Sequence, residues 1–439
     1  MTATSSGTDI RARRVMSGPK LHSRAWLITG LLFVFMLLNF ADKAVLGLAA
    51  GPLIKDFKLT PGEYGHVASS FYFLFSVSAL LVGFLANRIA TRWVLGVLAV
   101  IWALVQFPVG FTTSFGVLVA SRIALGAAEG PAYSTANHAL QKWFRNEDRQ
   151  LPSSVLAMGA SVGVIAAAPG LTWVIVNFGW RAAFIVLGVL GLIWVAAWQL
   201  LGSEGSVGDD GSLAIEVEQV ETPHVPYWKI FTSGTWLGTV LISFASYWGL
   251  ALLVAWLPSY LEKGLGYSVT TTGYLVTLPW ALSGVMILVS GFVSQRMMNA
   301  GVASRWARGM LASVVVIVGG VLTFVFTRIG GGALQIIVLT LAFGLAGITF
   351  ALASTLQGEI TPVRQRGAVL GAGLAVATIA GIFAPTVMGN LVQAAASPAA
   401  GYQQGFDVAG LLLLIGGVIG ALVIRPGKDT RRLLARDGA

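Results

Sequence analysis

Apolar residues occur in long runs separated by short polar segments along almost the whole chain. A helix needs about 20 mostly apolar residues to cross a bilayer, whereas membrane-spanning strands show shorter, alternating segments. The apolar runs lie near residues 25–50, 64–86, 93–113, 116–140, 153–178, 182–201, 235–260, 271–295, 307–327, 333–357, 367–394 and 406–424. The pattern therefore predicts an all-α membrane protein with twelve transmembrane helices.

The most polar stretch, residues 202–233, divides these runs into two sets of six. It predicts the following domains: a cytoplasmic N-tail (1–24), an N-terminal six-helix bundle (25–201), a cytoplasmic linker (202–233), a C-terminal six-helix bundle (234–424) and a cytoplasmic C-tail (425–439). A short repeat supports the division. Residues 83–88 read Gly-Phe-Leu-Ala-Asn-Arg and residues 291–296 read Gly-Phe-Val-Ser-Gln-Arg, at equivalent places in the two sets. Repeats of this kind favour two pseudo-symmetric bundles.

The basic residues predict the orientation, because cytoplasmic loops carry an excess of Lys and Arg. With both termini inside, most of the 28 Lys and Arg residues are cytoplasmic, and the outer loops hold only Lys55, Lys58, Arg181, Lys263 and Arg328. This bias explains the net charge of +10 better than nucleic-acid binding does. The first apolar run is expected to be a retained helix, since no small-residue cleavage site follows it. The lack of an Asn-x-Ser/Thr sequon agrees with a bacterial inner membrane.

Composition also bears on the chemistry. Only 10% of the residues are charged and cysteine is absent, which excludes disulfides, thiolate catalysis and cysteine-ligated metals. The sequence shows no His-rich metal cluster, nucleotide-phosphate loop or nucleophile elbow. It therefore predicts a protein that is not an enzyme and that holds no cofactor or metal.

Four ionisable residues lie inside predicted helices: Asp42 and Lys43 in the first, Arg122 and Glu129 in the fourth. Each costs ~2.5–3.5 kcal/mol on insertion scales, so each is a candidate functional residue. Arg122 and Glu129 are two helical turns apart and share a face, and Asp42 lies at the depth of Arg122, where the two could pair. Two acids and two bases can exchange partners when a proton or an anion arrives. The alternative is a static network that fixes helix packing.

Aromatic side chains in the spans are either cavity lining or packing. The candidates are Phe40, Tyr72, Phe75, Tyr247, Trp248, Trp256 and Tyr260. His138, near the inner end of the fourth span, is expected to be interfacial rather than a proton relay.

Two motifs resemble the major facilitator superfamily and, within it, the anion:cation symporter family of sugar-acid, phthalate and sialin-like carriers. They are Asn39-Phe40-Ala41-Asp42-Lys43 and Arg122-x-x-x-Gly126-x-x-Glu129-Gly130-Pro131. The resemblance implies that Asp42 and Glu129 couple transport to protons. It also implies substrate-binding residues, which are Lys43, Arg122, Phe40, Tyr72, Phe75, Ser161, Tyr247, Ser354 and Thr378.

The stretch from Gly83 to Arg92 is similar to the cytoplasmic gating loop of the superfamily, and its candidate residues are Gly83, Asn87, Arg88 and Arg92. Asn87 and, in the other half, Gln295 stand where an Asp is usual. The loss of these two acids is expected to weaken the lock between the halves.

Phe40 and Phe75 stand where the resemblance leads us to expect tyrosines. A buried site with fewer hydroxyl partners would leave the hydroxyl groups of a sugar unpaired. The expected function is thus proton-coupled symport of a small organic anion by alternating access, with an aromatic or weakly hydroxylated carboxylate as cargo and a single chain as the working unit. The alternatives are a proton-driven exporter of drugs or metabolites, a sugar-acid importer and a non-transporting membrane protein. The exporter is disfavoured because residues 159–170 lack the Gly-Pro-x-x-Gly-Gly ending typical of such carriers.

Overall fold

Helices make up nearly all of the computed structural model, which describes residues 19–85, 89–144, 150–205, 225–362 and 365–434. The N-terminal helices are α1 (Pro19–Leu48), α2 (Ala50–Phe57), α3 (Pro61–Ser70), α4 (Tyr72–Leu85), α5 (Thr91–Phe111), α6 (Phe115–Glu129), α7 (Ala132–Gln141), α8 (Gln150–Phe178) and α9 (Trp180–Leu201). The C-terminal helices are α11 (Tyr227–Phe231), α12 (Gly234–Ala255), α13 (Leu257–Ser259), η2 (Tyr260–Gly264), α14 (Val269–Leu275), α15 (Thr277–Asn299), η3 (Arg305–Met310), α16 (Leu311–Phe326), α17 (Gly332–Ala346), α18 (Ile348–Glu359), α19 (Arg366–Thr378), α20 (Ala380–Ala394), α21 (Pro398–Val423) and α22 (Pro426–Leu434).

Within the described residues, eleven helical segments are long and apolar enough to cross a membrane. Five of them are divided into two consecutive elements, which are α3 and α4, α14 and α15, η3 and α16, α17 and α18, and α19 and α20. The predicted fourth span, 116–140, is the exception, because it consists of α6 with 15 residues and α7 with 10. The break falls at Gly130 and Pro131, where proline has no backbone N–H to continue the helical hydrogen bonds. The predicted twelve spans thus correspond to these eleven segments and to the pair α6 and α7, which a two-residue turn separates. The break leaves Glu129 at the end of α6.

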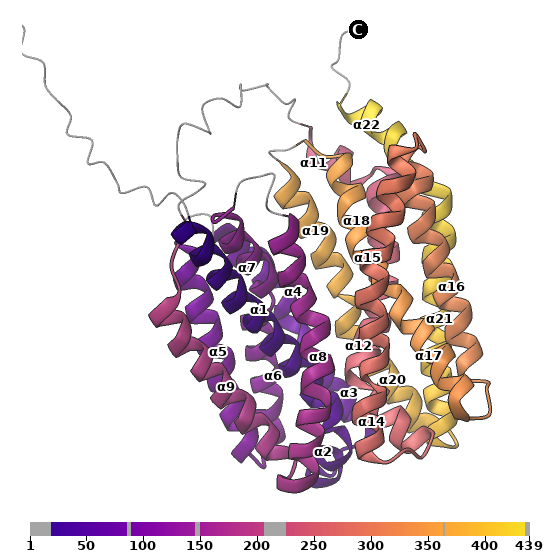
Figure 1. Ribbon diagram of the computed structural model, residues 1–439. Helices are drawn as coiled ribbons and strands as arrows, with labels where there is room; N and C mark the ends of the chain where they lie inside the picture. The colour runs from indigo at the N-terminus through magenta and orange to yellow at the C-terminus, as the bar shows by residue number, and fades with distance from the viewer. Residues whose placement is uncertain (1–18, 86–88, 145–149, 206–224, 363–364, 435–439) are drawn as a thin grey trace, which may run out of the picture.

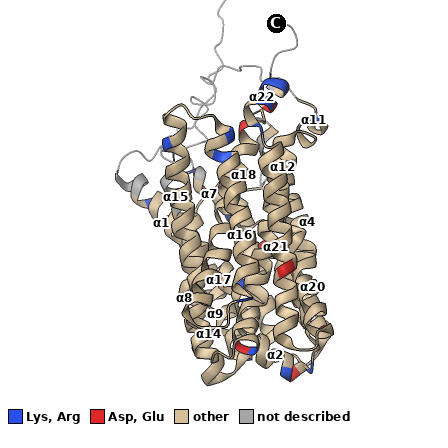
Figure 2. Ribbon diagram, turned by 90° about the vertical axis from the view of Figure 1, so that its right-hand side faces the viewer, with Lys and Arg blue, Asp and Glu red and all other residues tan. Residues whose placement is uncertain are grey.

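The two ends of the molecule differ in the elements that they carry. Helix α1 begins at the end where α11 and α22 lie, and the opposite end carries α2 and α14 (Figure 1). We refer to them as the α22 end and the α2 end. Coloured by charge, the molecule shows most of its acidic and basic residues near these two ends, with few charged residues between them (Figure 2). This is the distribution expected of a chain whose middle faces lipid.

The N-terminal helices and the C-terminal helices form two groups that lie side by side (Figure 1). The main contacts repeat between them, since α1 packs on α8 and α5 on α9 in the first group, while α12 packs on α20 and α16 on α21 in the second. Between the groups, α3 and α4 meet α20 and α19, and α8 meets α14 and α15. The architecture therefore confirms the predicted pair of similar helical bundles.

The two groups are closed against each other at the α2 end. The Tyr64 hydroxyl of α3 donates to the Ala255 carbonyl oxygen of α12 at 2.8 Å. Trp256, whose indole N–H donates to the Pro385 carbonyl oxygen of α20 at 3.0 Å within the C-terminal helices, meets the Tyr64 ring of α3 edge to face at 4.9 Å. Gly65 of α3 lies so close to α20 that a Cβ atom there would come within 2.5 Å of the same Pro385 oxygen. Backbone in direct contact with backbone leaves no passage between α3 and α20.

On α7 and α18, several exposed positions carry polar or small side chains. On α7 they include Tyr133 and Ser134, and on α18 they include Ala351, Ser354 and Thr355. Helix faces in contact with lipid are predominantly apolar, so these two faces suit contact with water. The combination favours a conformation that is closed at the α2 end and accessible from the α22 end.

Candidate functional site

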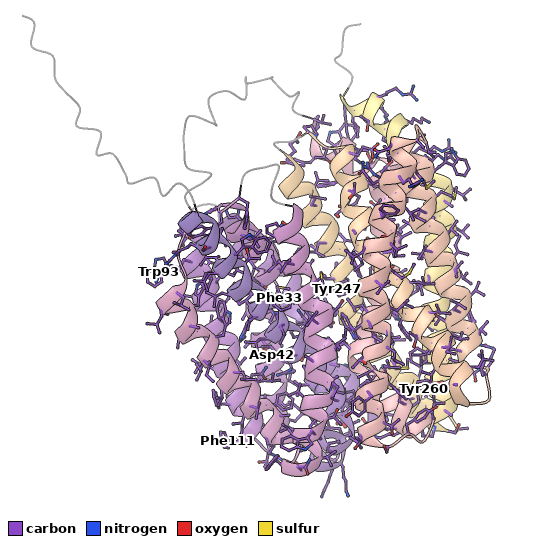
Figure 3. All side chains as sticks on the ribbon, in the orientation of Figure 1. Phe33, Asp42, Trp93, Phe111, Tyr247 and Tyr260 are labelled. Atoms are coloured by element: carbon purple, nitrogen blue, oxygen red, sulfur yellow. The ribbon has the colours of Figure 1, made fainter. Side chains whose placement is uncertain are left out.

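Helices α1 and α6 bring the four charged residues together inside the N-terminal helices. Asp42 is 2% exposed, and Arg122 and Glu129 are each 1% exposed. Figure 3 shows Asp42 about midway between the two ends. The Lys43 ammonium nitrogen lies 3.3 Å from Glu129 Oε2 and donates to Asn39 Oδ1 at 2.5 Å. Burying so many charges in one place is tolerated because each has an opposite charge or a hydrogen-bonding group beside it.

Asp42 and Arg122 do not pair directly. Gln106 of α5 lies between them: its side-chain N–H donates to Asp42 Oδ1 at 2.7 Å, and its oxygen accepts a hydrogen bond from Arg122 at 3.1 Å. The Gln106 side chain is completely buried. The predicted proximity of Asp42 and Arg122 is thus present, but an uncharged amide connects them. Gln106 was not among the predicted site residues. A polar amide in the middle of an otherwise apolar span is the feature of the sequence that could have identified it.

Several buried polar atoms of this cluster have no hydrogen-bond partner among the described residues. They are the two carboxylate oxygens of Glu129, the Nε of Arg122 and the Nδ2 of Asn39. Within the described part of the chain, Glu129 is held by its ion pair with Lys43. Buried groups of native proteins are generally satisfied, and exceptions occur at sites that bind something further. The cluster therefore has unused capacity for a proton or for an anion.

Aromatic rings surround the Lys43 ammonium group. Its nitrogen lies 4.4 Å from the centre of the Phe40 ring and 5.5 Å from that of the Phe75 ring. Trp280 of α15 meets Phe40 edge to face at 5.6 Å, and so extends this aromatic wall into the C-terminal helices. A cation beside aromatic rings is attracted by their negative faces. Lys43 is thus positioned where an anion with an apolar body could contact both charge and ring.

A second set of rings crosses from one group of helices to the other. Tyr72 of α4 meets Tyr247 of α12 edge to face at 5.9 Å, and Tyr247 meets Phe350 of α18 at the same distance. Figure 3 shows Tyr247 near the boundary between the two groups. These contacts join both groups of helices around the middle of the molecule.

A small cavity of about 30 Å³ lies between the two groups of helices. It is lined by Lys43, Leu46, Ala68, Phe71, Tyr72, Arg122, Ala251, Val254 and Ala255. Such a volume is enough for about one or two water molecules. Both basic residues reach it, so in this conformation the structure is closed around the groups that would meet an anion.

The remaining predicted substrate residues lie at different places. Thr378 is buried and its hydroxyl forms a hydrogen bond with that of Ser76, across the contact between α19 and α4. Ser161 lies on α8 beside Gly284 of α15. The Ser354 hydroxyl donates to the Ala351 carbonyl oxygen of its own helix at 2.9 Å and is exposed. Ser354 is thus not part of the cluster around Lys43 in this conformation.

Part of the predicted gating loop is described. Gly83 lies in the last part of α4, whereas Asn87 and Arg88 lie outside the described residues. Arg92 stands in the first turn of α5, where its backbone N–H donates to Glu204 Oε2 at 2.9 Å. Glu204 also accepts a hydrogen bond from the Thr91 hydroxyl at 2.9 Å and pairs with Lys142. Glu204 belongs to the stretch predicted to be a linker, residues 202–233, and was not among the predicted site residues.

The protonation of Glu204 reflects these contacts. Partial burial favours a higher pKa, but the hydrogen bonds from Lys142, Arg92 and Thr91 prevail and lower the pKa of Glu204 below its ordinary value. Glu204 is therefore an ionised residue that ties the end of α9 to the start of α5.

Comparison with known proteins gives the chain its context. The family model described as Major Facilitator Superfamily matches residues 32–385. A probable sulfoacetate transporter of Cupriavidus necator is 27% identical over 414 residues, covering 91% of this chain and 94% of the relative. The D-galactonate transporter of Escherichia coli O6:H1 is 26% identical over 425 residues, covering 90% and 96%. The crystal structure of a bacterial homologue of the human lysosomal transporter Spinster, in an inward-facing and occupied conformation, has a TM-score of 0.74 at 16% identity, covering 94% of this chain and 99% of that one.

Proposed function

The chain belongs to the major facilitator superfamily, and we propose that it carries a small organic anion across a bacterial inner membrane together with protons. It is a multi-pass membrane transporter rather than an enzyme. The proposal concerns the cargo, the coupling ion and the direction of transport. Its cargo class agrees with the two relatives described above, whose names give sulfoacetate and D-galactonate, both anions, as substrates.

The observation that carries the proposal is the position of Lys43. Its ammonium group lies against Phe40 and Phe75 and, with Arg122, lines the cavity between the two groups of helices. Two cations at one cavity attract an anion, and Arg122 can bind a carboxylate through two parallel hydrogen bonds. The rings beside Lys43 carry no hydroxyl group. An aromatic or weakly hydroxylated carboxylate therefore suits this site better than a sugar acid, whose hydroxyl groups would be left unpaired.

Asp42 and Glu129 are the proposed proton-coupling residues. Both are buried, and burial favours the neutral form of a carboxyl group while adjacent cations favour the charged form. An anion that takes over Lys43 from Glu129 would leave Glu129 as a buried charge without a partner. Proton binding to Glu129 removes that cost. Anion and proton binding thus assist each other, which is the thermodynamic requirement of symport.

The α22 end is the proposed cytoplasmic end, because the loops and tails predicted to be cytoplasmic from their basic residues belong to it. The conformation described is then one that faces the cytoplasm, closed on the outside by the contacts of Tyr64, Gly65 and Trp256. Alternating access requires that these contacts open while the α22 end closes. One chain contains both groups of helices, so a monomer is the proposed working unit.

The test is uptake into proteoliposomes of labelled benzoate, sulfoacetate and D-galactonate, with and without an inward proton gradient. We expect benzoate to accumulate only with the gradient. Asp42→Asn and Glu129→Gln should lose accumulation but still exchange benzoate across the membrane. The matched control is Asp407→Asn, which removes an acid that pairs with Arg328 outside the site and should leave accumulation unchanged. If no acid moves, or if the gradient drives the acid outward, the symport proposal fails and export becomes the better interpretation.

A further inference from the structure

The amide of Gln106 has only one possible orientation between its two neighbours. Arg122 can only donate hydrogen bonds, so the amide oxygen must face Arg122 and the amide N–H must face Asp42. The Asp42 oxygen that receives this N–H must then be an acceptor. Among the described residues, Gln106 is the one side chain that gives Asp42 a hydrogen bond. The three residues therefore form a chain with a defined direction, from Arg122 through Gln106 to Asp42.

The strength of this chain depends on the charge of Asp42. When Asp42 is ionised, the N–H of Gln106 donates to a full negative charge, and such hydrogen bonds are roughly twice as strong as neutral ones. The positive charge of Arg122 polarises the amide in the same sense, which strengthens both bonds together. When Asp42 binds a proton, the bond from Gln106 to Asp42 loses its charge assistance, and the bond from Arg122 to Gln106 loses the added polarisation that the charge of Asp42 supplied. Arg122 then keeps its positive charge without an anion at the other end of the chain.

Arg122 is able to respond to that change. It lines the cavity between the two groups of helices, and its Nε has no hydrogen-bond partner among the described residues. A direct ion pair with Asp42 would hold the guanidinium group on one side. The amide instead places an uncharged spacer between two charges, so that Arg122 senses Asp42 without being bound to it.

Few other charges face the three residues Arg122, Gln106 and Asp42. Lys43 lies next to Asp42 on α1, and Glu129 lies on α6 two turns from Arg122. Helices α8 and α12, which pack on α1, carry no charged residue, and α9, which packs on α5 and α1, carries only Arg181, near the α2 end and paired with Asp56. Helix α7, which packs on α5 and α1, contributes His138 as its one further ionisable side chain besides Tyr133. Tyr64 of α3 and Tyr72 of α4, two helices that pack on α6, are the remaining ionisable side chains close to Arg122.

We propose that Gln106 is a positioning residue that makes the availability of Arg122 to the anion depend on the protonation of Asp42. In this view a proton on Asp42 releases Arg122 toward the cavity, and deprotonation withdraws it. The inference rests on the proposed symport, for which it names the link between the proton site and the anion site. It assigns that link to an uncharged residue of α5, outside the two charged motifs of α1 and α6.

The first experiment needs no substrate. The infrared carboxylic-acid band of Asp42, identified by its loss in Asp42→Asn, is titrated against pH in purified protein reconstituted in lipid. Gln106→Leu removes the hydrogen bond that stabilises ionised Asp42, so the titration midpoint should rise by about 1–2 pH units. Gln335→Leu is the matched control, because Gln335 is an equally buried amide on α17 in the other group of helices. Its titration should match that of the unaltered protein.

Gln106→Glu separates positioning from a merely structural role. In its protonated form the introduced carboxylic acid can accept from Arg122 and donate toward Asp42, so benzoate exchange at low pH should resemble that of the unaltered protein. Once this side chain ionises it repels Asp42, so exchange should fall at a lower pH than normal. A Gln106→Leu protein that folds should exchange benzoate with little dependence on pH.

The outcomes separate the two proposals. If the unaltered protein moves none of the three acids, the symport proposal fails, while the infrared titration still decides whether Gln106 controls Asp42. If Gln106→Leu and Gln106→Glu titrate within about 0.3 pH units of the unaltered protein, a change far below that expected for a lost charge-assisted bond, the link through Gln106 is refuted even if symport stands. An upward shift in Gln106→Leu combined with a normal pH profile of exchange would also refute it, because Arg122 would then not respond to Asp42.

Discussion

Gly65 offers the most direct test of how the α2 end closes. An added Cβ atom at this position would lie 2.5 Å from the Pro385 carbonyl oxygen and 3.0 Å from Thr386 Cα. Both neighbours are backbone atoms of α20, so no side-chain rotation can remove the overlap. Helices α3 and α20 belong to different groups of helices. Gly65→Ala should therefore raise the free energy of the closed α2 end without affecting either group by itself.

The magnitude follows from the cost of overpacking, which is roughly 1–3 kcal/mol for an extra methyl or methylene group in a packed interface. Because about 1.4 kcal/mol changes an equilibrium constant tenfold, the population opened at the α2 end should rise roughly 5- to 150-fold. Helix α20 packs against α12 and α21, so it cannot readily shift away from an added methyl group. The increase in the opened population should therefore lie toward the upper end of this range. Transport should slow, since one of the two end states becomes harder to reach.

The assay uses the absence of native cysteine in the chain. Ser69 is 4% exposed, and its oxygen accepts hydrogen bonds from the backbone N–H and the hydroxyl of Thr386 across the same interface. In a Ser69→Cys background, a membrane-impermeant maleimide added to intact cells should label the cysteine only when the α2 end opens. Its labelling rate should rise in Gly65→Ala by the factor given above.

Gly417→Ala is the matched control. Its added Cβ atom would lie 2.6 Å from the Ile317 side chain and 3.0 Å from the Ser313 oxygen, so the overlap is similar but lies within the C-terminal helices. It should lower the melting temperature and leave the labelling rate unchanged. Equal labelling in Gly65→Ala and the parent, with both proteins folded, would refute the reasoning. So would an equal acceleration by Gly417→Ala.

Three further predictions concern single side chains. Lys43→Met leaves Glu129 buried without its cation, which costs about 3–5 kcal/mol while Glu129 is ionised. The melting temperature should therefore fall more at pH 8 than at pH 5, and the fall should largely disappear when Glu129→Gln is added. An equal fall at both pH values would contradict this prediction. Phe75→Tyr places a hydroxyl group near Lys43. Uptake of D-galactonate relative to benzoate should rise roughly 2- to 12-fold, the change in affinity that one hydrogen bond contributes. An unchanged ratio in competition uptake would show that this ring does not face the cargo. Burial raises the pKa of Glu262 to about 7, despite the nearby Lys263, so the folded state loses stability as pH rises from about 4.5 through 7. Glu262→Gln should raise the melting temperature at pH 8 and leave it nearly unchanged at pH 4. A gain of the same size at both pH values would contradict the raised pKa.

The apolar pattern was enough to predict the helices, because the cost of an unpaired backbone group in lipid leaves few alternatives. It did not predict the break at Gly130 and Pro131, since a hydropathy pattern measures the composition of a segment and not its continuity. The broken helix is still apolar enough overall to resemble a single span. Only the geometry of α6 and α7 shows that Glu129 is the last residue of a short helix.

The charged part of the site was predictable for a related reason. An ionised residue in a span carries so large a cost that its presence alone marks it as a candidate functional residue, and all four predicted residues lie together in the structure. Gln106 carries a much smaller cost, and its importance depends on where α5 passes between α1 and α6. Glu204 could not be predicted because it lies in the acidic stretch predicted to be a linker, residues 202–233. Its contacts with Thr91, Arg92 and Lys142 depend on how α9 ends.

The division of the site between the two groups of helices constrains the mechanism. Asp42, Lys43, Gln106, Arg122 and Glu129 all belong to the N-terminal helices, whereas the described C-terminal helices bring apolar and aromatic side chains to the cavity and its surroundings. A movement of one group past the other can thus change the volume and the hydration of the cavity without breaking any hydrogen bond of the charged network. Protonation can in turn change the network without moving either group. Lys43 and Arg122 are the two residues that belong to the network and also line the cavity. Any coupling between proton binding and movement is therefore expected to act through what these two residues contact in the cavity, either the proposed anion or the water that replaces it.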